Sequence, residues 1–448
     1  MQSNIKPQPT FIYRWTILLF ISLAMFGNYY IYDSISPLAD LLVKQLKFTD
    51  ADIGLLQGIY SFPNIIMVLI GGIIIDKIGT RTSVLIFTCL IMIGSIITAL
   101  TGNLILMASG RLIFGLGAES MIVAITTIIA RWFKGKELSF AFGLNLTVAR
   151  LGSFLALNSP TWGKSLYNYW QSPLLITVGA GIFALIAIII YYFLDVLGTK
   201  RFTLPEEGTQ EKVILKEVFN FPKSFWYITA LCVTFYSAMF PFQTFAIKFF
   251  QDAHNTTREV GGNLSSMLTL AAMIFTPLFG LLADKIGKRS LLMMFGSLLI
   301  IPVYLMMAYK VGKPDIMTQS DFININLDFF DIHASIPIYL MIPMSIMGIA
   351  FSLVPAVMWP SVALIVENSK LGTAYGLMTM IQNIGLFSFN IIIGFANDIS
   401  RASAQNPSGY NLGMWIFSSL GFFGLLFAYL LRKSERSLNG HGLENRSN

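Results

Sequence analysis

Long apolar runs alternate with short polar segments along nearly the whole chain. Windows of about 19 residues, the length suited to membrane-spanning helices, predict helices at 15–38, 52–75, 83–101, 104–130, 138–158, 173–195, 224–250, 262–283, 290–309, 336–366, 372–395 and 410–431. Six lie on each side of one long hydrophilic segment, residues 198–223. The pattern predicts an all-α membrane protein of two six-helix bundles, residues 1–197 and 224–448, joined by a cytoplasmic linker.

The composition excludes a soluble protein. Hydrophobic residues make up 55% of the 448 positions and charged residues 12%, whereas soluble domains carry about 25% charged residues. The 2 cysteines, Cys89 and Cys232, each lie inside an apolar run, which disfavours a zinc site or a disulfide framework. We expect no metal, no cofactor, no nucleic-acid partner and no enzymatic activity, because the sequence offers no catalytic carboxylate pair and no phosphate-binding loop.

Membrane orientation accounts for the net charge of +7. Basic residues accumulate in short cytoplasmic loops, and most Lys and Arg fall on one side if the N-terminus lies inside. Both termini are then cytoplasmic. The first apolar run, from Trp15, has no small-residue cleavage site, so we expect a retained span. The short loops favour a bacterial inner membrane, and a lysosomal membrane is the alternative for a eukaryotic chain.

Two turns share one motif at the same spacing. The motif combines two glycines, an aspartate, a lysine and an arginine, at Gly72, Asp76, Lys77, Gly79 and Arg81 and again at Gly280, Asp284, Lys285, Gly287 and Arg289. Short turns attract these residue types individually, but five matches at fixed spacing favour internal duplication. Two related halves imply a pseudo-two-fold axis along the membrane normal and a substrate site at mid-depth.

Both turns resemble the loop signature of the major facilitator superfamily, and the segment 110–117 resembles its fourth-helix motif. Further stretches are similar to the lysosomal dipeptide uniporter branch of that superfamily, namely Phe26–Asp33, Gly117–Ser120, Trp132–Leu138, Ala149–Ser153, Phe240–Phe242 and Leu371–Gly376. The resemblance implies uniport of dipeptides by alternating access. The segment Gly143–Arg150 lacks the G-P-x-x-G-G run of drug antiporters, which argues against multidrug efflux.

Four charged residues are assigned to bilayer depth within the predicted spans, namely Asp33, Arg111, Glu119 and Arg150. Each costs about 2.5–3.5 kcal/mol on insertion scales, so each requires a functional or structural reason. Glu119 and Arg150 both reach mid-depth, because successive helices run in opposite directions. Glu119 can bind the amino group of a dipeptide, and Arg150 its carboxylate; the resemblance implies the same assignment. A structural Glu119–Arg150 ion pair is the alternative, and both hold if substrate opens the pair.

Asp33 and Arg111 are predicted nearer the outer leaflet. Asp33 shares the first span with Tyr29 and is a candidate for binding an ammonium or a cationic side chain; the alternative is a hydrated carboxylate bonded to neighbouring hydroxyls. Arg111 begins the fourth span, where we expect it to snorkel toward the interface and brace a gate outside the substrate site. No histidine lies within the predicted spans, so proton coupling would require Asp33 or Glu119.

The second half contains no acid or arginine at comparable depth, so its part of a substrate site must come from aromatic and amide groups. The candidates are Phe240, Gln243, Trp359, Tyr375, Gln382 and Asn383. Prolines interrupt the predicted seventh and tenth spans, and such interruptions in membrane helices often line cavities. Ordinary packing is the alternative for any single aromatic residue.

The repeated turns are predicted to gate the cytoplasmic face. Asp76 and Asp284 can cap the helices that follow and accept hydrogen bonds from nearby basic residues. The basic candidates are Arg81, Arg131 and Arg289. Breaking these contacts would favour an inward-open state, and the alternative is a solvated turn without a conformational role.

Together these observations predict a secondary transporter that moves zwitterionic dipeptides by alternating access, by uniport or together with protons. We expect it to act in the lipid bilayer as a monomer. One alternative is a facilitator of another small organic anion that uses Arg150 alone. The other is a non-transporting membrane receptor or assembly partner, for which we would expect a soluble appendage larger than the tail from Arg432.

Overall fold

The computed structural model of this 448-residue chain describes residues 7–134, 137–204, 221–327, 332–367, 370–437 and 440–444. Within these ranges, 11 helices are long and apolar enough to cross a membrane, or up to 12 if the bent pair Asp50–Met67 and Ile70–Ile78 forms one span. The predicted all-α membrane architecture is therefore confirmed.

Contacts between residues divide the chain into two compact units. Unit 1 comprises Met1–Ser34, Ile59–Ala156 and Gln171–Gln210, and unit 2 comprises Ile35–Gly58, Leu157–Trp170 and Glu211–Asn448. Two segments of the first half therefore group with the second. The predicted boundary at 198–223 stays a prediction, and most of that segment lies outside the described residues.

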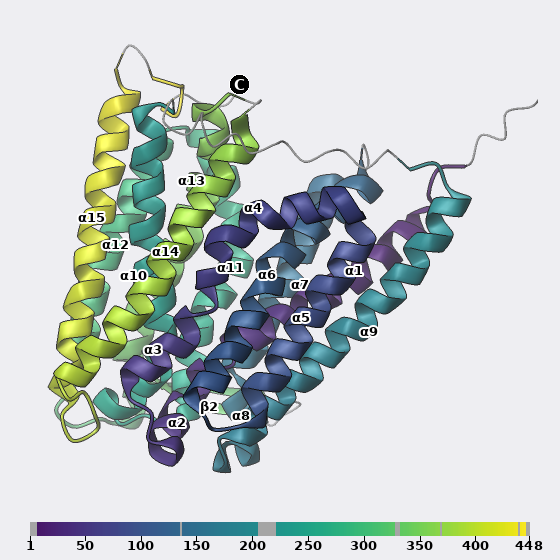
Figure 1. The fold of residues 1–448 in the computed structure, drawn as a ribbon. Helices are drawn as coiled ribbons and strands as arrows, with labels where there is room; N and C mark the ends of the chain where they lie inside the picture. The colour runs from purple at the N-terminus through teal and green to yellow at the C-terminus, as the bar shows by residue number, and fades with distance from the viewer. Residues whose placement is uncertain are drawn as a thin grey trace, which may run out of the picture. The chain divides into compact units, whose positions relative to one another are not determined.

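The described part of unit 1 contains six long helices. They are α1 (Phe11–Asp33), α4 (Ser61–Ile78), α5 (Thr80–Leu100), α6 (Leu104–Phe133), α7 (Leu138–Leu157) and α9 (Gln171–Arg201). The α5 helix packs along α6 and α9, and α1 packs along α9 (Figure 1). A Cβ atom added at Gly94 would lie 2.5 Å from the backbone nitrogen of Phe114. Glycine therefore permits the close approach of α5 and α6, as small residues do between membrane helices.

Unit 2 contains the remaining helices. The short ones are α2 (Ala39–Leu46), α3 (Asp50–Gly58) and α8 (Ser159–Trp162), and the long ones are α10 (Lys223–His254), α11 (Arg258–Ile286), α12 (Arg289–Ala308), α13 (Ile338–Ile365), α14 (Leu371–Ile399) and α15 (Asn411–Glu435). Figure 1 shows α12 and α15 side by side, and α11 and α12 both pack on α13. Prolines lie inside α10, α11, α12 and α13 without ending these helices.

The predicted second span, 52–75, is divided into α3 and α4. The carbonyl of Ile59 accepts a hydrogen bond from the backbone of Phe62 at 3.3 Å. Pro63 has no N–H to donate to the carbonyl four residues earlier, and that carbonyl belongs to Ile59. The proline therefore explains the short turn between α3 and α4, which a hydropathy window cannot detect.

The repeated motif forms the same turn in both units. Gly79 ends α4 with a φ of 82°, and Gly287 ends α11 with a φ of 66°. Each glycine N–H donates to the carbonyl four residues earlier, Ile75 or Ala283, at 2.9 Å. A positive φ is costly for residues with a Cβ atom, which explains glycine at this position of both copies.

A β-hairpin lies between α12 and α13. Strands β1 (Phe322–Leu327) and β2 (Ile332–Pro337) pair antiparallel, with Phe322 opposite Pro337. These strands were not predicted from the sequence. Apolar and polar residues alternate from Ile323 to Leu327, which is the period-two pattern of a strand.

Candidate functional site

The charged residues predicted for substrate binding gather around one tyrosine of unit 1. The guanidinium carbon of Arg150 lies 5.4 Å from the centroid of the Tyr29 ring. Glu119 and Asp33, together with Arg150, are close enough to Tyr29 to act on it electrostatically. Helices α1, α6 and α7 therefore bring one cation and two carboxylates together, and we call these four residues the Tyr29 cluster.

A second tyrosine, which sequence reasoning missed, holds Glu119. The hydroxyl of Tyr60 donates to Oε1 of Glu119 at 2.9 Å. The Tyr60 ring is packed 4.8 Å from the ring of Tyr32 and 5.2 Å from that of Phe114. A hydroxyl is a neutral donor, so it orients the carboxylate without cancelling its charge. A phenol inside an apolar run was the only signal in the sequence.

Arg111 adopts a position that differs from the predicted one. Its side chain is 1% exposed and does not snorkel. It donates to the carbonyls of Ile31 at 3.1 Å and Tyr32 at 3.2 Å, in the last turn of α1. Carbonyls at a helix C-terminus carry partial negative charge and attract cations, so Arg111 ties α6 to the end of α1 next to Asp33. Its predicted gating role is untested.

Three predicted residues of unit 2 are connected through Tyr236. The rings of Phe240 and Tyr236 stack at 5.6 Å. Trp359 donates its indole N–H to the Tyr236 hydroxyl at 2.9 Å, and the Tyr375 hydroxyl donates to the Trp359 carbonyl at 3.1 Å. We call these four residues the Tyr236 cluster. Tyr236 itself was not predicted, although it precedes Phe240 by one helical turn.

The predicted amide residues of unit 2 make other contacts. Gln382 accepts from the thiol of Cys232 at 3.6 Å. The main-chain carbonyl of Gln243 accepts from Ser36 at 2.6 Å. Asn383 is 2% exposed, and among the described residues its Oδ1 has no hydrogen-bond partner. Their assignment to a substrate site stays a prediction.

The gating residue Arg81 has a partner that was not predicted. Arg81 binds Asp195 of α9 at 2.7 Å, and the indole of Trp132 donates to the same carboxylate at 2.9 Å. Asp195 is 0% exposed, so a buried carboxylate joins α5, α6 and α9. Arg289 pairs with Asp284 at 2.5 Å, which is a contact of the kind predicted for the turn aspartates.

The two turn aspartates do not occupy the N-cap positions assigned to the following helices. Those positions are Gly79 before α5 and Lys288 before α12, and neither contributes a side-chain cap. The predicted capping of α5 by Asp76 and of α12 by Asp284 was therefore wrong, because each helix begins several residues after its aspartate. The gating role of the turns is untested.

A buried charged network in unit 2 also escaped prediction. The Lys248 ammonium, on α10, lies 3.2 Å from Asp50, 3.1 Å from Asp252 and 2.7 Å from the hydroxyl of Tyr410. The Asp398 carboxylate accepts from the backbone N–H of Asp50 at 2.9 Å, at the start of α3. We call the first four residues the Lys248 network. It was missed because each charge lies near the end of a helix, where solvated side chains are common.

Comparison with known proteins identifies the family. The family model described as Major Facilitator Superfamily matches residues 21–309 and 242–447. The lysosomal dipeptide transporter MFSD1 of Danio rerio is 30% identical over 401 residues, covering 87% of this chain and 81% of that protein. The Homo sapiens protein of the same name is 31% identical over 400 residues, covering 86% and 80%.

A solved structure supports the same fold. The crystal structure of a single-residue mutant of the nucleoside transporter NupG superimposes with a TM-score of 0.71 at 14% identity, covering 93% of this chain and 99% of that one. At this identity the likeness concerns the fold alone. The family match and the extent of the MFSD1 alignments are sufficient to assign the family without this structure. The chain belongs to the Major Facilitator Superfamily.

Proposed function

We propose that this multi-pass membrane transporter moves zwitterionic dipeptides by alternating access, as a uniporter or together with protons. The observation that carries the proposal is the Tyr29 cluster, in which a guanidinium and two carboxylates gather inside one helical unit. The dipeptide transporters that are 30% and 31% identical to this chain support the substrate class. We place the protein in a bacterial inner membrane with cytoplasmic termini, and in a lysosomal membrane if the chain is eukaryotic.

Arg150 is assigned to the substrate carboxylate. A guanidinium stays charged and presents parallel donors that match the two oxygens of a carboxylate. The face of the Tyr29 ring lies 5.4 Å from the Arg150 guanidinium carbon, and such cation–π contact restrains the orientation of the guanidinium plane. A lysine at position 150 would keep the charge but lose the two-pronged geometry.

Glu119 is assigned to the substrate ammonium. Its carboxylate already accepts the Tyr60 hydroxyl, so its orientation is set before substrate arrives. A carboxylate in a lipid-shielded bundle gains more from a cation than it would in water, because the local dielectric constant is lower. Asp33 supplies a second carboxylate near Tyr29 and is assigned to cationic side chains of the peptide.

Counterflow in proteoliposomes tests the substrate class. The panel comprises a neutral dipeptide, the corresponding free amino acids and a small dicarboxylate without an amino group. We expect the dipeptide to exchange and the other compounds to exchange poorly. Exchange of the dicarboxylate alone would overturn the proposal and favour an organic-anion facilitator, while absence of any exchange would favour a receptor.

An arginine variant and a matched control connect the activity to the site. Charged hydrogen bonds contribute about 1.5–3 kcal/mol each, so Arg150→Gln should lower dipeptide exchange by at least about tenfold. Glu367→Gln is the control, because the Glu367 side chain is 75% exposed and pairs with Lys370 three residues away. Unchanged exchange by Arg150→Gln would contradict the assignment.

A further inference from the structure

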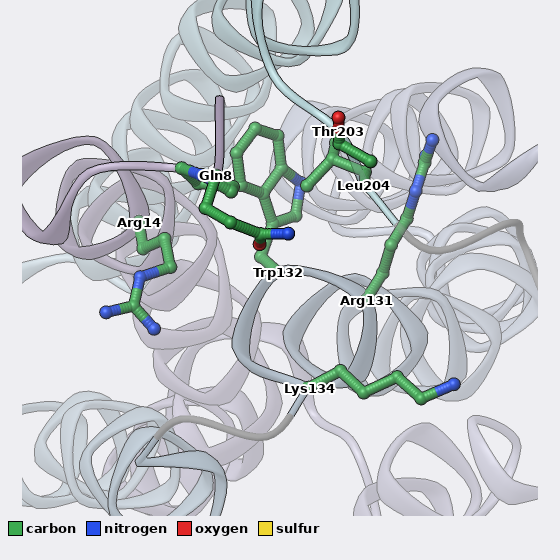
Figure 2. A pocket seen from close by; sticks show the side chains of 8 residues that line it. Gln8, Arg14, Arg131, Trp132, Lys134, Thr203 and Leu204 are labelled. Atoms are coloured by element: carbon green, nitrogen blue, oxygen red, sulfur yellow. The ribbon is translucent and has the colours of Figure 1, made fainter. Parts of the chain in front are cut away.

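Three basic side chains surround a pocket at one end of unit 1. The pocket has a volume of about 360 Å³ and is lined by Gln8, Pro9, Arg14, Arg131, Trp132, Lys134, Thr203 and Leu204. Figure 2 shows Arg14 on one side of Gln8 and Trp132, with Arg131 and Lys134 on the other. All eight residues are described by the structure, and none of them is acidic. We call this the basic pocket.

The chain trace places the basic pocket at one membrane face. Arg14 lies in the first turn of α1, Arg131 and Lys134 lie at the end of α6, and Thr203 follows the end of α9. The predicted orientation assigns this end to the cytoplasm, where bilayers carry anionic lipids and basic segments accumulate.

Arg14 is built into the pocket rather than extended into solvent. Its residue is 4% exposed, and its guanidinium carbon lies 5.4 Å from the centroid of the Phe133 ring. Nη1 lies 3.2 Å from the carboxylate of Glu137, yet Nε and Nη1 have no hydrogen-bond partner among the described residues. Nε therefore lacks a nearby acceptor among the described residues, which costs free energy for a buried N–H group, and an anion with several oxygens would supply one.

Apolar side chains connect the basic pocket to the lipid-facing surface. The Phe133 ring beneath Arg14 contacts Trp15 at 5.5 Å, and Trp15 contacts Phe140 at 5.6 Å. Phe140 is 65% exposed and Phe11 is 60% exposed. Aromatic residues at such positions mark the headgroup level of a bilayer. At this level one lipid can contact basic side chains with its headgroup and apolar side chains with its acyl chains. This continuity favours a lipid over a soluble anion.

We propose that the basic pocket binds the phosphate of an anionic phospholipid headgroup. Guanidinium groups match phosphate oxygens through parallel hydrogen bonds. The three positive charges of Arg14, Arg131 and Lys134 exceed the one negative charge of Glu137, which lies 3.2 Å from Arg14. Gln8 provides an amide for the hydroxyls of a headgroup such as glycerol. The acyl chains then lie on the exposed apolar surface that includes Phe11 and Phe140. The proposal is independent of the transported substrate.

Native mass spectrometry of the delipidated, full-length protein tests the site. Phosphatidylglycerol and phosphatidylcholine with identical acyl chains are titrated separately. Because each basic residue near an anionic lipid contributes about fivefold in affinity, we expect Lys134→Gln and Arg14→Gln each to lower phosphatidylglycerol binding by about that factor. Lys200→Gln is the control, because Lys200 is exposed on α9 and does not line the pocket.

The outcomes are distinguishable. Lys134 is exposed, so its substitution should not disturb folding, whereas Arg14→Gln also removes a buried contact. Equal binding of both lipids by the wild type, or unchanged phosphatidylglycerol binding by Lys134→Gln, would overturn the proposal. Displacement of phosphatidylglycerol by millimolar sn-glycerol 3-phosphate or inorganic phosphate would also overturn it, in favour of a soluble phosphate.

Discussion

Tyr60 and Tyr29 determine how the charges of the candidate site are held. Tyr60 orients Glu119 through a hydrogen bond of 2.9 Å, and Tyr29 presents its ring to Arg150 at 5.4 Å. Both tyrosine side chains are neutral, so these contacts orient Glu119 and Arg150 without changing their formal charges.

Tyr60→Phe should weaken transport without disturbing the packing. The substitution removes only the hydroxyl that donates to Glu119, while the ring contacts with Tyr32 and Phe114 remain. A hydrogen bond to a charged group contributes about 1.5–3 kcal/mol, which corresponds to a loss of about tenfold or more in exchange rate. Initial counterflow rates measure the effect.

Tyr169→Phe is the control for that experiment, because Tyr169 is 52% exposed. Equal rates for the wild type and Tyr60→Phe would show that Glu119 needs no positioning by Tyr60. Thermal unfolding of both variants should match the wild type within a few degrees.

Charged residues of the site could be predicted from the sequence, but their partners could not. The cost of a charge at bilayer depth draws attention to Glu119 and Arg150 wherever they lie in a span. The roles of Tyr60 and Asp195 become apparent only when it is known which helices pack against each other. A hydropathy profile does not contain that information. Lys248 was overlooked because its position near a predicted helix end suggested a solvated side chain.

At the scale of helices, glycine positions determine how closely α3 and α14 approach. A Cβ atom at Gly54 would lie 2.2 Å from the carbonyl oxygen of Asn390. The same interface holds the Asp398 carboxylate against the backbone N–H groups of Asp50 at 2.9 Å and Ala51 at 2.8 Å. The first turn of α3 therefore depends on a separation that only glycine allows.

Gly54→Ala should destabilise the protein, because the backbone of α14 must move to accommodate the added methyl group. Overpacking of this kind typically costs about 1–3 kcal/mol. Gly143→Ala on α7 is the matched control, since an added Cβ atom there meets nothing within 4 Å. Thermal unfolding in detergent should rank Gly54→Ala below the wild type and Gly143→Ala at or above it. The reverse order would contradict the close packing of α3 and α14.

Most spans could be predicted because long apolar windows report helices directly. The break between α3 and α4 depends on one proline, Pro63, and the hairpin β1–β2 depends on only a few alternating residues. Such local features are averaged out by a window of about 19 residues. The glycine turns at Gly79 and Gly287 were recognised because the motif occurs twice.

At the scale of the whole molecule, family membership and the membrane-spanning helices define a transporter. Its orientation in the membrane is the next property to test. The positive-inside rule predicts a cytoplasmic C-terminal tail. Ser437→Cys lies in that tail, and Ser335→Cys lies on the hairpin; both serines are exposed. A membrane-impermeant maleimide applied to intact cells should label position 335 and spare position 437. Labelling of position 437 alone would show that the chain has the opposite orientation in the membrane.

The central claim is that Arg150 and Glu119 bind opposite ends of one dipeptide. Calorimetric dissociation constants for a dipeptide, its N-acetyl form and its C-terminal amide, each with the wild type, Glu119→Gln and Arg150→Gln, test it most directly. Glu119→Gln should weaken binding of the dipeptide and of the amide, which both carry an ammonium, and should leave binding of the N-acetyl form unaffected. Arg150→Gln should weaken binding of the dipeptide and of the N-acetyl form, which both carry a carboxylate, and should leave binding of the amide unaffected. Equal weakening of all three ligands by each variant would contradict the claim and indicate a purely structural role for the two charges.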